Sequence, residues 1–174
     1  MGSASPIGLS ELAQTQTEKA SALANSIAKR DGLLLTGATT GLIYLVGKTA
    51  HDLGVFHLGI SPASNREEHL NNYRLPLDAC DAIVYTGFGL KGRNVVLVRS
   101  CDIVLFIAGA MGSLNEFTIA HDEGKVIGCL SGTGGVADES DMLLLKFGKQ
   151  TGARVFHNDD PEELIERCLR ALKE

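Results

Sequence analysis

Arg93 and Glu116 are the two charged residues whose positions point to chemistry. Glu116 ends the run Ala-Gly-Ala-Met-Gly-Ser-Leu-Asn-Glu at residues 108–116, which follows an apolar stretch and opens a helical pattern. Glycines at such a strand-to-helix turn let backbone N–H groups gather at the helix N-terminus, where they can hold an anion. Arg93 lies 23 residues earlier, after a similar turn. Two turns at one sheet edge would bring its guanidinium near Glu116.

A second glycine-rich turn offers further donors for an anion. Residues 36–42, Thr-Gly-Ala-Thr-Thr-Gly-Leu, follow a short apolar run and precede a helical pattern. Backbone amides and two hydroxyls in such a turn can ring a phosphate. A compact turn without a ligand is the alternative. The candidate phosphate-binding residues of the two turns are Gly37, Ala38, Thr39, Thr40, Gly41, Gly109, Ala110, Met111, Gly112 and Ser113.

Both charged residues also have a purely structural interpretation. Residues 113–116 match the capping box Ser-x-x-Glu, in which the Ser113 hydroxyl accepts from the amide of Glu116 and the carboxylate accepts from the amide of Ser113. A capping box would explain Glu116, but not the small residues before it, which clear space for a ligand near the backbone. For Arg93 the alternative to ligand binding is a solvated side chain or an ion pair at a helix end.

Two nucleotide-binding motifs are matched only in part. Five residues separate Gly41 from Gly47-Lys48-Thr49, one more than a P-loop allows, and the triplet lies inside a helical pattern. Residues 87–92 fit the GxGxxG pattern after a strand, but no acid follows the next strand to bind a ribose hydroxyl. We interpret this stretch as a turn that presents Arg93. No resident cofactor is expected.

The elements that must position these residues alternate along the chain. Short β-rich runs occur at 33–35, 55–60, 82–85, 103–107, 126–130 and 154–156. Stretches with helical spacing occur at 10–29, 41–53, 92–100, 113–123, 138–150 and 161–172. Apolar strands that alternate with helices predict a parallel sheet covered on both faces. The predicted fold class is therefore α/β, a Rossmann-like doubly wound parallel sheet in one domain spanning residues 1–174.

Three segments fall outside this alternation. Residues 61–81 are polar without a clear period, and residues 131–137 are rich in glycine, so both are expected to be surface loops. A doubly wound sheet usually opens with a strand, whereas here a helical pattern begins almost at once. Met1-Gly2-Ser3 resembles the end of such a strand, which leaves open whether the first strand is missing.

Composition narrows the classes of function. The net charge of -5 argues against a broad basic surface, so neither nucleic acid nor a membrane is expected as a partner. The four cysteines form no CxxC pair and the histidines show no HxxxH or HxH spacing, so no metal site is expected. No signal-peptide pattern and no apolar stretch of about 18 residues is present. These features favour a cytoplasmic protein.

The motifs resemble those of the LOG family, long labelled as lysine decarboxylases, whose characterised members are cytokinin-activating nucleoside 5'-monophosphate phosphoribohydrolases. Residues 108–116 are similar to the family signature Pro-Gly-Gly-x-Gly-Thr-x-Glu-Glu, and residues 36–43 to its Gly-Gly-Gly-x-x-Gly-Leu-Met turn. Arg93 and Arg99 match the Arg-Lys segment and the following Arg of the family. The separation of Arg93 and Glu116 equals the family spacing, and the resemblance covers nearly the whole chain after Gly2.

Four departures from the family pattern bear on catalysis. Ala108 stands where Pro is expected, Ala110 replaces a Gly, Asn94 replaces Lys, and Asn115 replaces the first Glu of the signature. An Arg-Asn pair and a relaxed signature are more similar to the related branch that includes the molybdenum cofactor carrier proteins, which share the fold but bind a ligand. Phosphate binding tolerates these changes better than catalysis does.

The resemblance implies one of two functions, with a phosphorylated small molecule as partner in both. As an enzyme, the protein would hydrolyse the N-glycosidic bond of a nucleoside 5'-monophosphate to free base and ribose 5-phosphate. Arg93 would then orient the sugar, and Glu116 would stabilise the oxocarbenium ion or position water. As a carrier or sensor, it would hold molybdenum cofactor or a nucleotide without turnover. The resemblance also implies a homo-oligomer, either a dimer or a tetramer.

Overall fold

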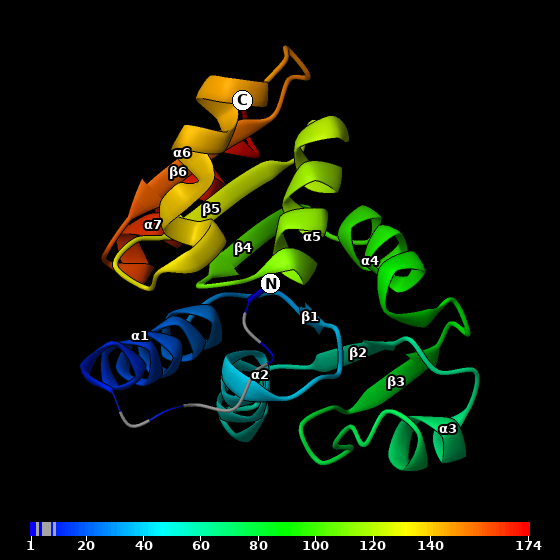
Figure 1. Ribbon diagram of the computed structural model, residues 1–174. Helices are drawn as coiled ribbons and strands as arrows, with labels where there is room; N and C mark the ends of the chain where they lie inside the picture. Colours follow the sequence, from blue (N-terminus) through cyan, green and yellow to red (C-terminus); the bar gives the residue numbers. More distant parts are fainter. Residues whose placement is uncertain (3, 5–7, 9) are drawn as a thin grey trace.

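Helices and strands alternate along the chain (Figure 1). The computed structural model describes residues 1–2, 4, 8 and 10–174. The elements are α1 (Glu11–Ala28), β1 (Leu34–Thr36), α2 (Gly41–Asp52), β2 (His57–Ser61), α3 (Arg66–Asn71), β3 (Ala82–Tyr85), α4 (Gly89–Arg99), β4 (Ile103–Ile107), α5 (Met111–Asp122), β5 (Val126–Leu130), α6 (Gly135–Phe147), β6 (Arg154–Asn158) and α7 (Pro161–Ala171).

All the strand pairings are parallel, as the alternation of strands and helices predicts. Strands β1, β2 and β3 form one ladder, with Leu58 opposite Ala82. Strands β4, β5 and β6 form a second ladder, with Phe106 opposite Cys129. Each predicted strand is confirmed to within two residues at its ends. A run of apolar, β-branched residues between two helical patterns was therefore a sufficient signal for these short strands.

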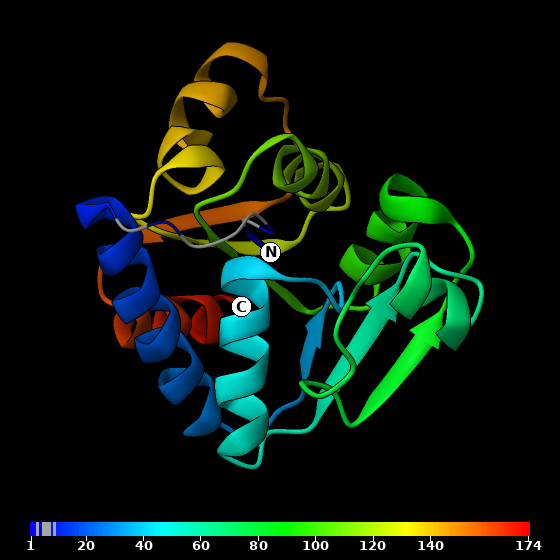
Figure 2. The same ribbon diagram turned by 60° about the horizontal axis from the view of Figure 1, so that its bottom comes forward.

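Helices cover both faces of the sheet, which confirms the doubly wound α/β prediction. Along β4, Ile103, Leu105 and Ile107 contact the core formed with α1, α2 and α7. The alternate residues Val104 and Phe106 contact the core formed with α4, α5 and α6. Successive side chains of a strand point to opposite faces, so one apolar strand supplies two cores. Figure 2 shows the two helical layers on either side of the strands.

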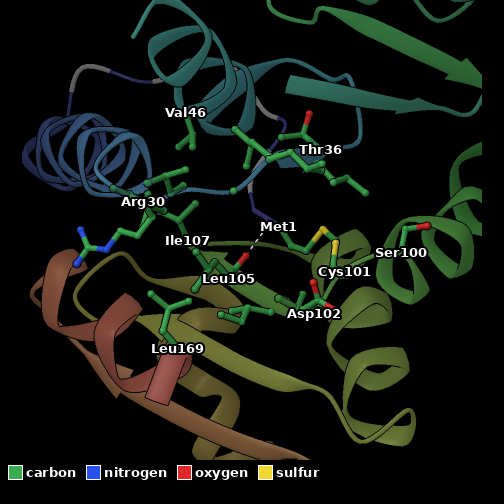
Figure 3. A pocket seen from close by; sticks show the side chains of 18 of the residues that line it. Met1, Arg30, Thr36, Val46, Ser100, Cys101, Asp102, Leu105, Ile107 and Leu169 are labelled. Carbon is green, nitrogen blue, oxygen red and sulfur yellow. Dashed lines mark hydrogen bonds between the residues drawn. The ribbon is translucent and has the colours of Figure 1, made fainter. Parts of the chain in front are cut away.

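The edge strands β1 and β4 of the two ladders face each other without pairing, and Met1 and Gly2 lie between them. Gly2 forms an isolated parallel bridge with Ile107, and the Ile107 amide donates to the Met1 carbonyl at 3.0 Å. A cavity of about 420 Å³ opens between the two edges beyond Met1 (Figure 3). Met1 and Gly2 thus occupy the place of a strand end, as their sequence indicated, while Ser3 lies outside the described residues.

The first of two loop predictions is wrong, because residues 61–81 contain helix α3. The Asn65 side chain accepts from the amide of Glu68 at 2.9 Å, and the Glu68 carboxylate accepts from the amide of Ser64 at 2.7 Å. This reciprocal capping starts a helix too short to show a period. The spacing of Asn65 and Glu68 was the local signal for it.

The second loop prediction, for residues 131–137, is wrong at its end. Helix α6 begins at Gly135, three residues before the predicted start at Asp138. The Asp138 carboxylate accepts from the amides of Gly132 and Gly134, at 2.8 and 2.7 Å, and so ties the turn to the helix. A carboxylate in the first turn stabilises a helix N-terminus even when glycines precede it.

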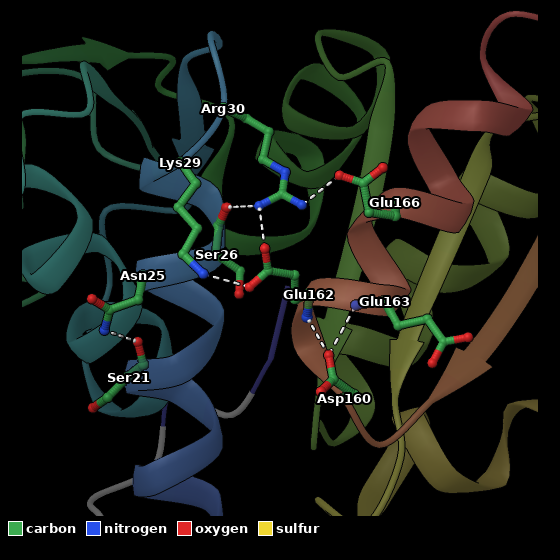
Figure 4. A network of polar contacts seen from close by, with 9 residues as sticks. All are labelled: Ser21, Asn25, Ser26, Lys29, Arg30, Asp160, Glu162, Glu163 and Glu166. Atoms are coloured by element: carbon green, nitrogen blue, oxygen red, sulfur yellow. Dashed lines mark hydrogen bonds and ion pairs between the residues drawn. The ribbon is translucent and has the colours of Figure 1, made fainter.

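Polar contacts join α1 to α7 at the surface (Figure 4). Arg30 lies between the carboxylates of Glu162 and Glu166, with its closest approach at 2.5 Å to Glu166. Asp160 accepts from the amides of Glu162 and Glu163 and caps α7, which begins at Pro161. No helix within the described residues is long and apolar enough to cross a membrane.

Replacing Phe106 by Ala should destabilise the protein by about 3–5 kcal/mol, the usual cost of truncating a buried aromatic residue. Phe106 is fully buried on β4, and its ring packs edge-to-face on Phe117 with centroids 5.6 Å apart. Urea denaturation of both proteins measures the difference. Phe147→Ala is the matched control because that ring is 79% exposed. Equal effects of the two substitutions would contradict the assignment of Phe106 to the core.

Candidate functional site

The turn from β4 into α5 presents the backbone amides that the sequence indicated. Ala108 and Gly109 have positive φ values of 51° and 110°, and α5 begins at Met111. Two hydrogen bonds hold the turn against the start of α6. The Ala108 amide donates to Thr133 Oγ1, just before this helix, at 2.8 Å, and the Gly109 carbonyl accepts from the Val136 amide at 3.0 Å. The first amides of an α-helix have no partner inside the helix. Such amides can donate to an anion.

The predicted capping box at residues 113–116 is wrong. Leu114 already donates to the Ala110 carbonyl at 2.9 Å, so α5 starts two residues before Ser113 and its cap is Ala110, without a side-chain bond. The buried Ser113 hydroxyl instead donates to the Gly2 carbonyl at 3.0 Å. Because Ser113 is not the N-cap residue, the structural explanation for Glu116 is removed. The Ser113 hydroxyl proton is used in this hydrogen bond to the N-terminal segment.

Arg93 lies on α4 and reaches the backbone of Gly37 in the β1–α2 turn and the side chain of Glu116. A Cβ added at Gly37 would lie 1.8 Å from Arg93 Nη1, so only glycine at this position allows the guanidinium to pass. Arg93 Nη1 is 4.0 Å from Glu116 Oε1, which places the pair together as predicted. Arg93 is only 6% exposed, and its Nε is buried without a hydrogen-bond partner among the described residues. A buried unpaired donor of this kind is rare in folded proteins.

Glu116 is a buried carboxyl on the first turns of α5, 7% exposed. Burial raises the pKa of Glu116, and the nearby ammonium of Met1 and the guanidinium of Arg93 offset part of this rise. With its amide turned so that Nδ2 faces the carboxyl, Asn94 donates to Glu116 Oε1 at 3.1 Å and to the Leu90 carbonyl at 3.0 Å. Asn94 is therefore a direct partner of the Glu116 carboxyl. The sequence had marked Asn94 only as a departure from a family pattern.

The turn from β1 into α2 forms the opposite side of the site. Ala38 has a φ of 47°, and its amide donates to Thr36 Oγ1 at 3.2 Å. Thr39 borders the cavity. The Thr40 hydroxyl donates to the carbonyl of Ala4 at 2.7 Å. Of the two hydroxyls that could ring a phosphate, the one of Thr40 is thus engaged with the N-terminal segment.

These two turns and α4 enclose a cavity of about 360 Å³. The predicted residues that line it are Gly37, Thr39, Arg93, Ala110, Gly112, Ser113 and Glu116. The predicted residues outside its lining are Ala38, Thr40, Gly41, Gly109 and Met111. Arg93 and Glu116 come together in its wall, whereas Met111 is 73% exposed and points elsewhere.

Sequence reasoning missed Lys91, Asn94 and Thr36, which also line the cavity. Lys91 Nζ lies 3.8 Å from the position that a Cβ would take on Gly112, so its ammonium stands over the start of α5. Lys91 belongs to the GxGxxG stretch that we interpreted as a turn. The interpretation of residues 87–92 as a turn is wrong from Gly89 on, where α4 begins, so Lys91 and Arg93 both lie in the first turns of this helix. A cation two residues before Arg93 was the available signal.

A family model, described as the SLOG cluster4 family, matches residues 1–165. The chain belongs to this family. The resemblance to the LOG family drawn from residues 36–43 and 108–116 is thereby confirmed. An uncharacterized protein of Archaeoglobus fulgidus is 28% identical to this SLOG cluster4 protein over 143 residues, which are 82% of this chain and 78% of the relative.

Solved structures share the fold of this SLOG cluster4 protein. TM1055 superposes with a TM-score of 0.83 at 24% identity, over 98% of this chain and 96% of its own. The molybdenum cofactor carrier protein of Chlamydomonas reinhardtii superposes with a TM-score of 0.70 at 22% identity, over 100% and 96%. The molybdenum cofactor binding protein of Rippkaea orientalis gives 0.68 at 23% identity, over 92% and 89%. These likenesses show the fold.

The raised pKa of Glu116 predicts a pH-dependent stability. The folded protein binds this proton more tightly than the unfolded chain, so the Glu116 contribution is complete below about pH 4.5, the ordinary value, and is lost as the pH rises through the higher folded value. The free energy of unfolding of the wild type, measured with urea, should therefore fall relative to that of Glu116→Gln across this window. Glu163→Gln, at an exposed position on α7, is the control and should follow the wild type.

Proposed function

We propose that the protein binds a phosphorylated small molecule in the cavity between α4, α5 and the β1–α2 turn. The observation that carries this proposal is the buried guanidinium of Arg93, whose Nε makes no hydrogen bond to any described residue. Its nearest carboxylate is at 4.0 Å, beyond hydrogen-bond distance. A phosphate oxygen is a partner that a guanidinium binds well, through two parallel N–H groups.

The surroundings of Arg93 favour a phosphate over a neutral ligand. The amides at the start of α5 and the ammonium of Lys91 approach the same cavity, so cationic side chains and a helix N-terminus converge there. Gly112 keeps that helix start free of side-chain bulk. The volume of about 360 Å³ lies within the usual range for small-molecule sites, about 300–1,000 Å³.

A carrier or sensor that does not turn its ligand over is the form of this function that we favour. Two structures with the same fold are described as a molybdenum cofactor carrier and a molybdenum cofactor binding protein, which supports a phosphorylated ligand of that kind. In this chain Asn94 and Asn115 lie with their amides 2.8 Å apart beside Glu116. These neutral groups position the one remaining carboxyl but supply no second acid or base.

Arg93→Ala should weaken binding of nucleoside 5'-monophosphates and inorganic phosphate by about tenfold or more, since a charge-assisted hydrogen bond contributes about 1.5–3 kcal/mol. Thermal shift with a ligand series and isothermal titration measure the loss. Arg99→Ala is the matched control, because Arg99 lies on the same helix, is exposed and pairs with Glu123. The substitution Gly37→Ala removes no charge, but it should also weaken binding because the added Cβ would displace the Arg93 guanidinium. Unchanged affinity in both site variants would contradict the proposal.

A second candidate function is hydrolysis of a nucleoside 5'-monophosphate, and the position of Glu116 favours it. In this reaction water adds to the anomeric carbon, the N-glycosidic bond breaks, and the base leaves with the proton. A carboxylate beside the anomeric carbon stabilises the oxocarbenium-like transition state or orients the water. Glu116 lines the cavity next to Arg93, which could hold the sugar phosphate in place.

For the hydrolysis candidate, the wild-type protein should release free base from a member of a nucleoside 5'-monophosphate panel, and Glu116→Gln should lose nearly all of that activity. Chromatographic detection of the base and of ribose 5-phosphate measures it. The same Glu116→Gln protein should still bind the monophosphate, because the cations remain. Binding without release of base by the wild type would assign the protein to the carrier class.

A further inference from the structure

Two buried histidines make the same pattern of hydrogen bonds at the carboxyl ends of the neighbouring strands β1 and β2. His57 and His69 are 1% and 0% exposed. One nitrogen of each ring contacts a backbone carbonyl, and the other contacts the hydroxyl of the last residue of a strand. That hydroxyl oxygen accepts from the amide two residues later. Each pattern is a relay of bonds from a carbonyl, through an imidazole and a hydroxyl, to a backbone amide.

The first relay runs through His57 and ends in the β1–α2 turn. The Nδ1 atom of His57 contacts the carbonyl of Ala79, and Nε2 lies 2.8 Å from Thr36 Oγ1. Because a carbonyl can only accept, Nδ1 carries the hydrogen and Nε2 accepts from the Thr36 hydroxyl. The Thr36 oxygen in turn accepts from the Ala38 amide at 3.2 Å. The histidine therefore fixes the direction of the Thr36 hydroxyl.

The surroundings of His57 keep its ring neutral and in one place. Burial lowers the pKa of His57, and the hydrogen bond to the Ala79 carbonyl offsets part of this effect. Cys80 Sγ lies 3.9 Å from Nε2, and burial raises the pKa of this thiol to about 11, so the thiol brings no charge to the ring at neutral pH. A Cβ on Gly47 would lie 2.4 Å from His57 Cε1, so helix α2 packs directly on the ring. The glycine of the Gly47-Lys48-Thr49 triplet thus makes room for this histidine.

The amide at the end of the first relay belongs to a strained residue of the β1–α2 turn. Ala38 has a φ of 47°, a conformation that is rare for a residue with a side chain and persists where neighbouring contacts impose it. The bond from the Ala38 amide to Thr36 is one such contact. A Cβ on Gly59 would lie 2.8 Å from Ala38 Cβ, so β2 supplies another. Because Gly37, where the Arg93 guanidinium passes, directly precedes Ala38, a change in this conformation would alter the wall of the ligand cavity.

We propose that His57 is a positioning residue for the ligand cavity: its bond to the Thr36 hydroxyl holds the β1–α2 turn in the conformation that receives a phosphorylated ligand. Among the described residues, His57 lies outside the cavity lining and Thr36 lies within it. The inference rests on the proposed function for its ligand, but the effect of His57 on the turn is measurable without one. The relay needs an acceptor at position 57, which leucine lacks and glutamine retains.

The second relay, through His69, is a matched control within the same protein. His69 Nε2 lies 3.1 Å from the Pro76 carbonyl, and Nδ1 lies 2.8 Å from Ser61 Oγ. The Ser61 oxygen accepts from the Ala63 amide at 3.1 Å. His69 is as deeply buried as His57, but His69, Ser61 and Ala63 are not among the residues that line the ligand cavity. Loss of the second relay should therefore lower stability without an effect on phosphate binding.

The test compares the wild type with His57→Leu, His57→Gln and His69→Leu. Thr36→Val, which removes the hydroxyl, is a second way to break the first relay. Hydrogen exchange without phosphate measures the protection of the Ala38 and Ala63 amides, one at the end of each relay. Titration with inorganic phosphate, followed by NMR, measures binding. Urea denaturation shows which variants are folded and how stable they are.

His57→Leu and Thr36→Val should speed exchange of the Ala38 amide by about tenfold, with no comparable change at Ala63. His57→Leu should also weaken phosphate binding by about fivefold or more, the effect of one lost hydrogen bond. His57→Gln should recover part of this affinity, because an acceptor returns. His69→Leu should speed exchange at Ala63 alone and bind phosphate like the wild type.

Unchanged exchange of the Ala38 amide in His57→Leu and Thr36→Val would overturn the proposal, whether or not phosphate binds. Equal losses of phosphate affinity in His57→Leu and His69→Leu would also overturn it, because the loss would then follow from stability alone. If His57→Leu does not fold, Thr36→Val decides by the same exchange measurement. A wild-type protein that does not bind phosphate would contradict the proposed function instead, and exchange at Ala38 would still decide whether His57 holds the turn.

Discussion

The contact between the Arg93 guanidinium and the backbone of Gly37 is the constraint on which the site depends. It brings α4, which follows the first ladder of strands, against the β1–α2 turn, and it leaves Arg93 beside Glu116 on α5. A long cationic side chain can be buried here only because residue 37 has no Cβ. The same contact keeps the guanidinium buried, and its Nε has no hydrogen-bond partner among the described residues. Burial of a charged group is costly, and this cost is the reason for proposing an anionic ligand beside Arg93.

The main features of the fold and of the site were predictable because they depend on local signals. Apolar runs between helical patterns predicted the strands, and parallel strands bring their carboxyl ends to one sheet edge. Arg93 and Glu116 both follow such ends, so their approach could be predicted without knowing any distance. Asn65 and Glu68 carried an equally local signal for α3, which was overlooked because the helix is too short to show a period.

The remaining features depend on contacts between distant parts of the chain. The start of α5 is set by bonds from the turn at Ala108 to Thr133 and Val136, so no pattern within residues 108–116 could show that Ser113 is not a cap. The division of the strands into two ladders likewise depends on the relative positions of β1 and β4, which are far apart in the sequence. The single domain, the homo-oligomer and the cytoplasmic location stay predictions from sequence.

The position of Met1 has a practical consequence for handling this protein. An affinity tag is usually attached to a chain end on the assumption that the end is at the surface. Here Met1 is half-buried, between the sheet edges and in the wall of both cavities, whereas the side chain of Glu174 is 77% exposed. A tag attached directly to Met1 would begin beside the cavity between β1 and β4. A carboxyl-terminal tag leaves the interior unchanged and is the appropriate choice for purification and for any ligand measurement.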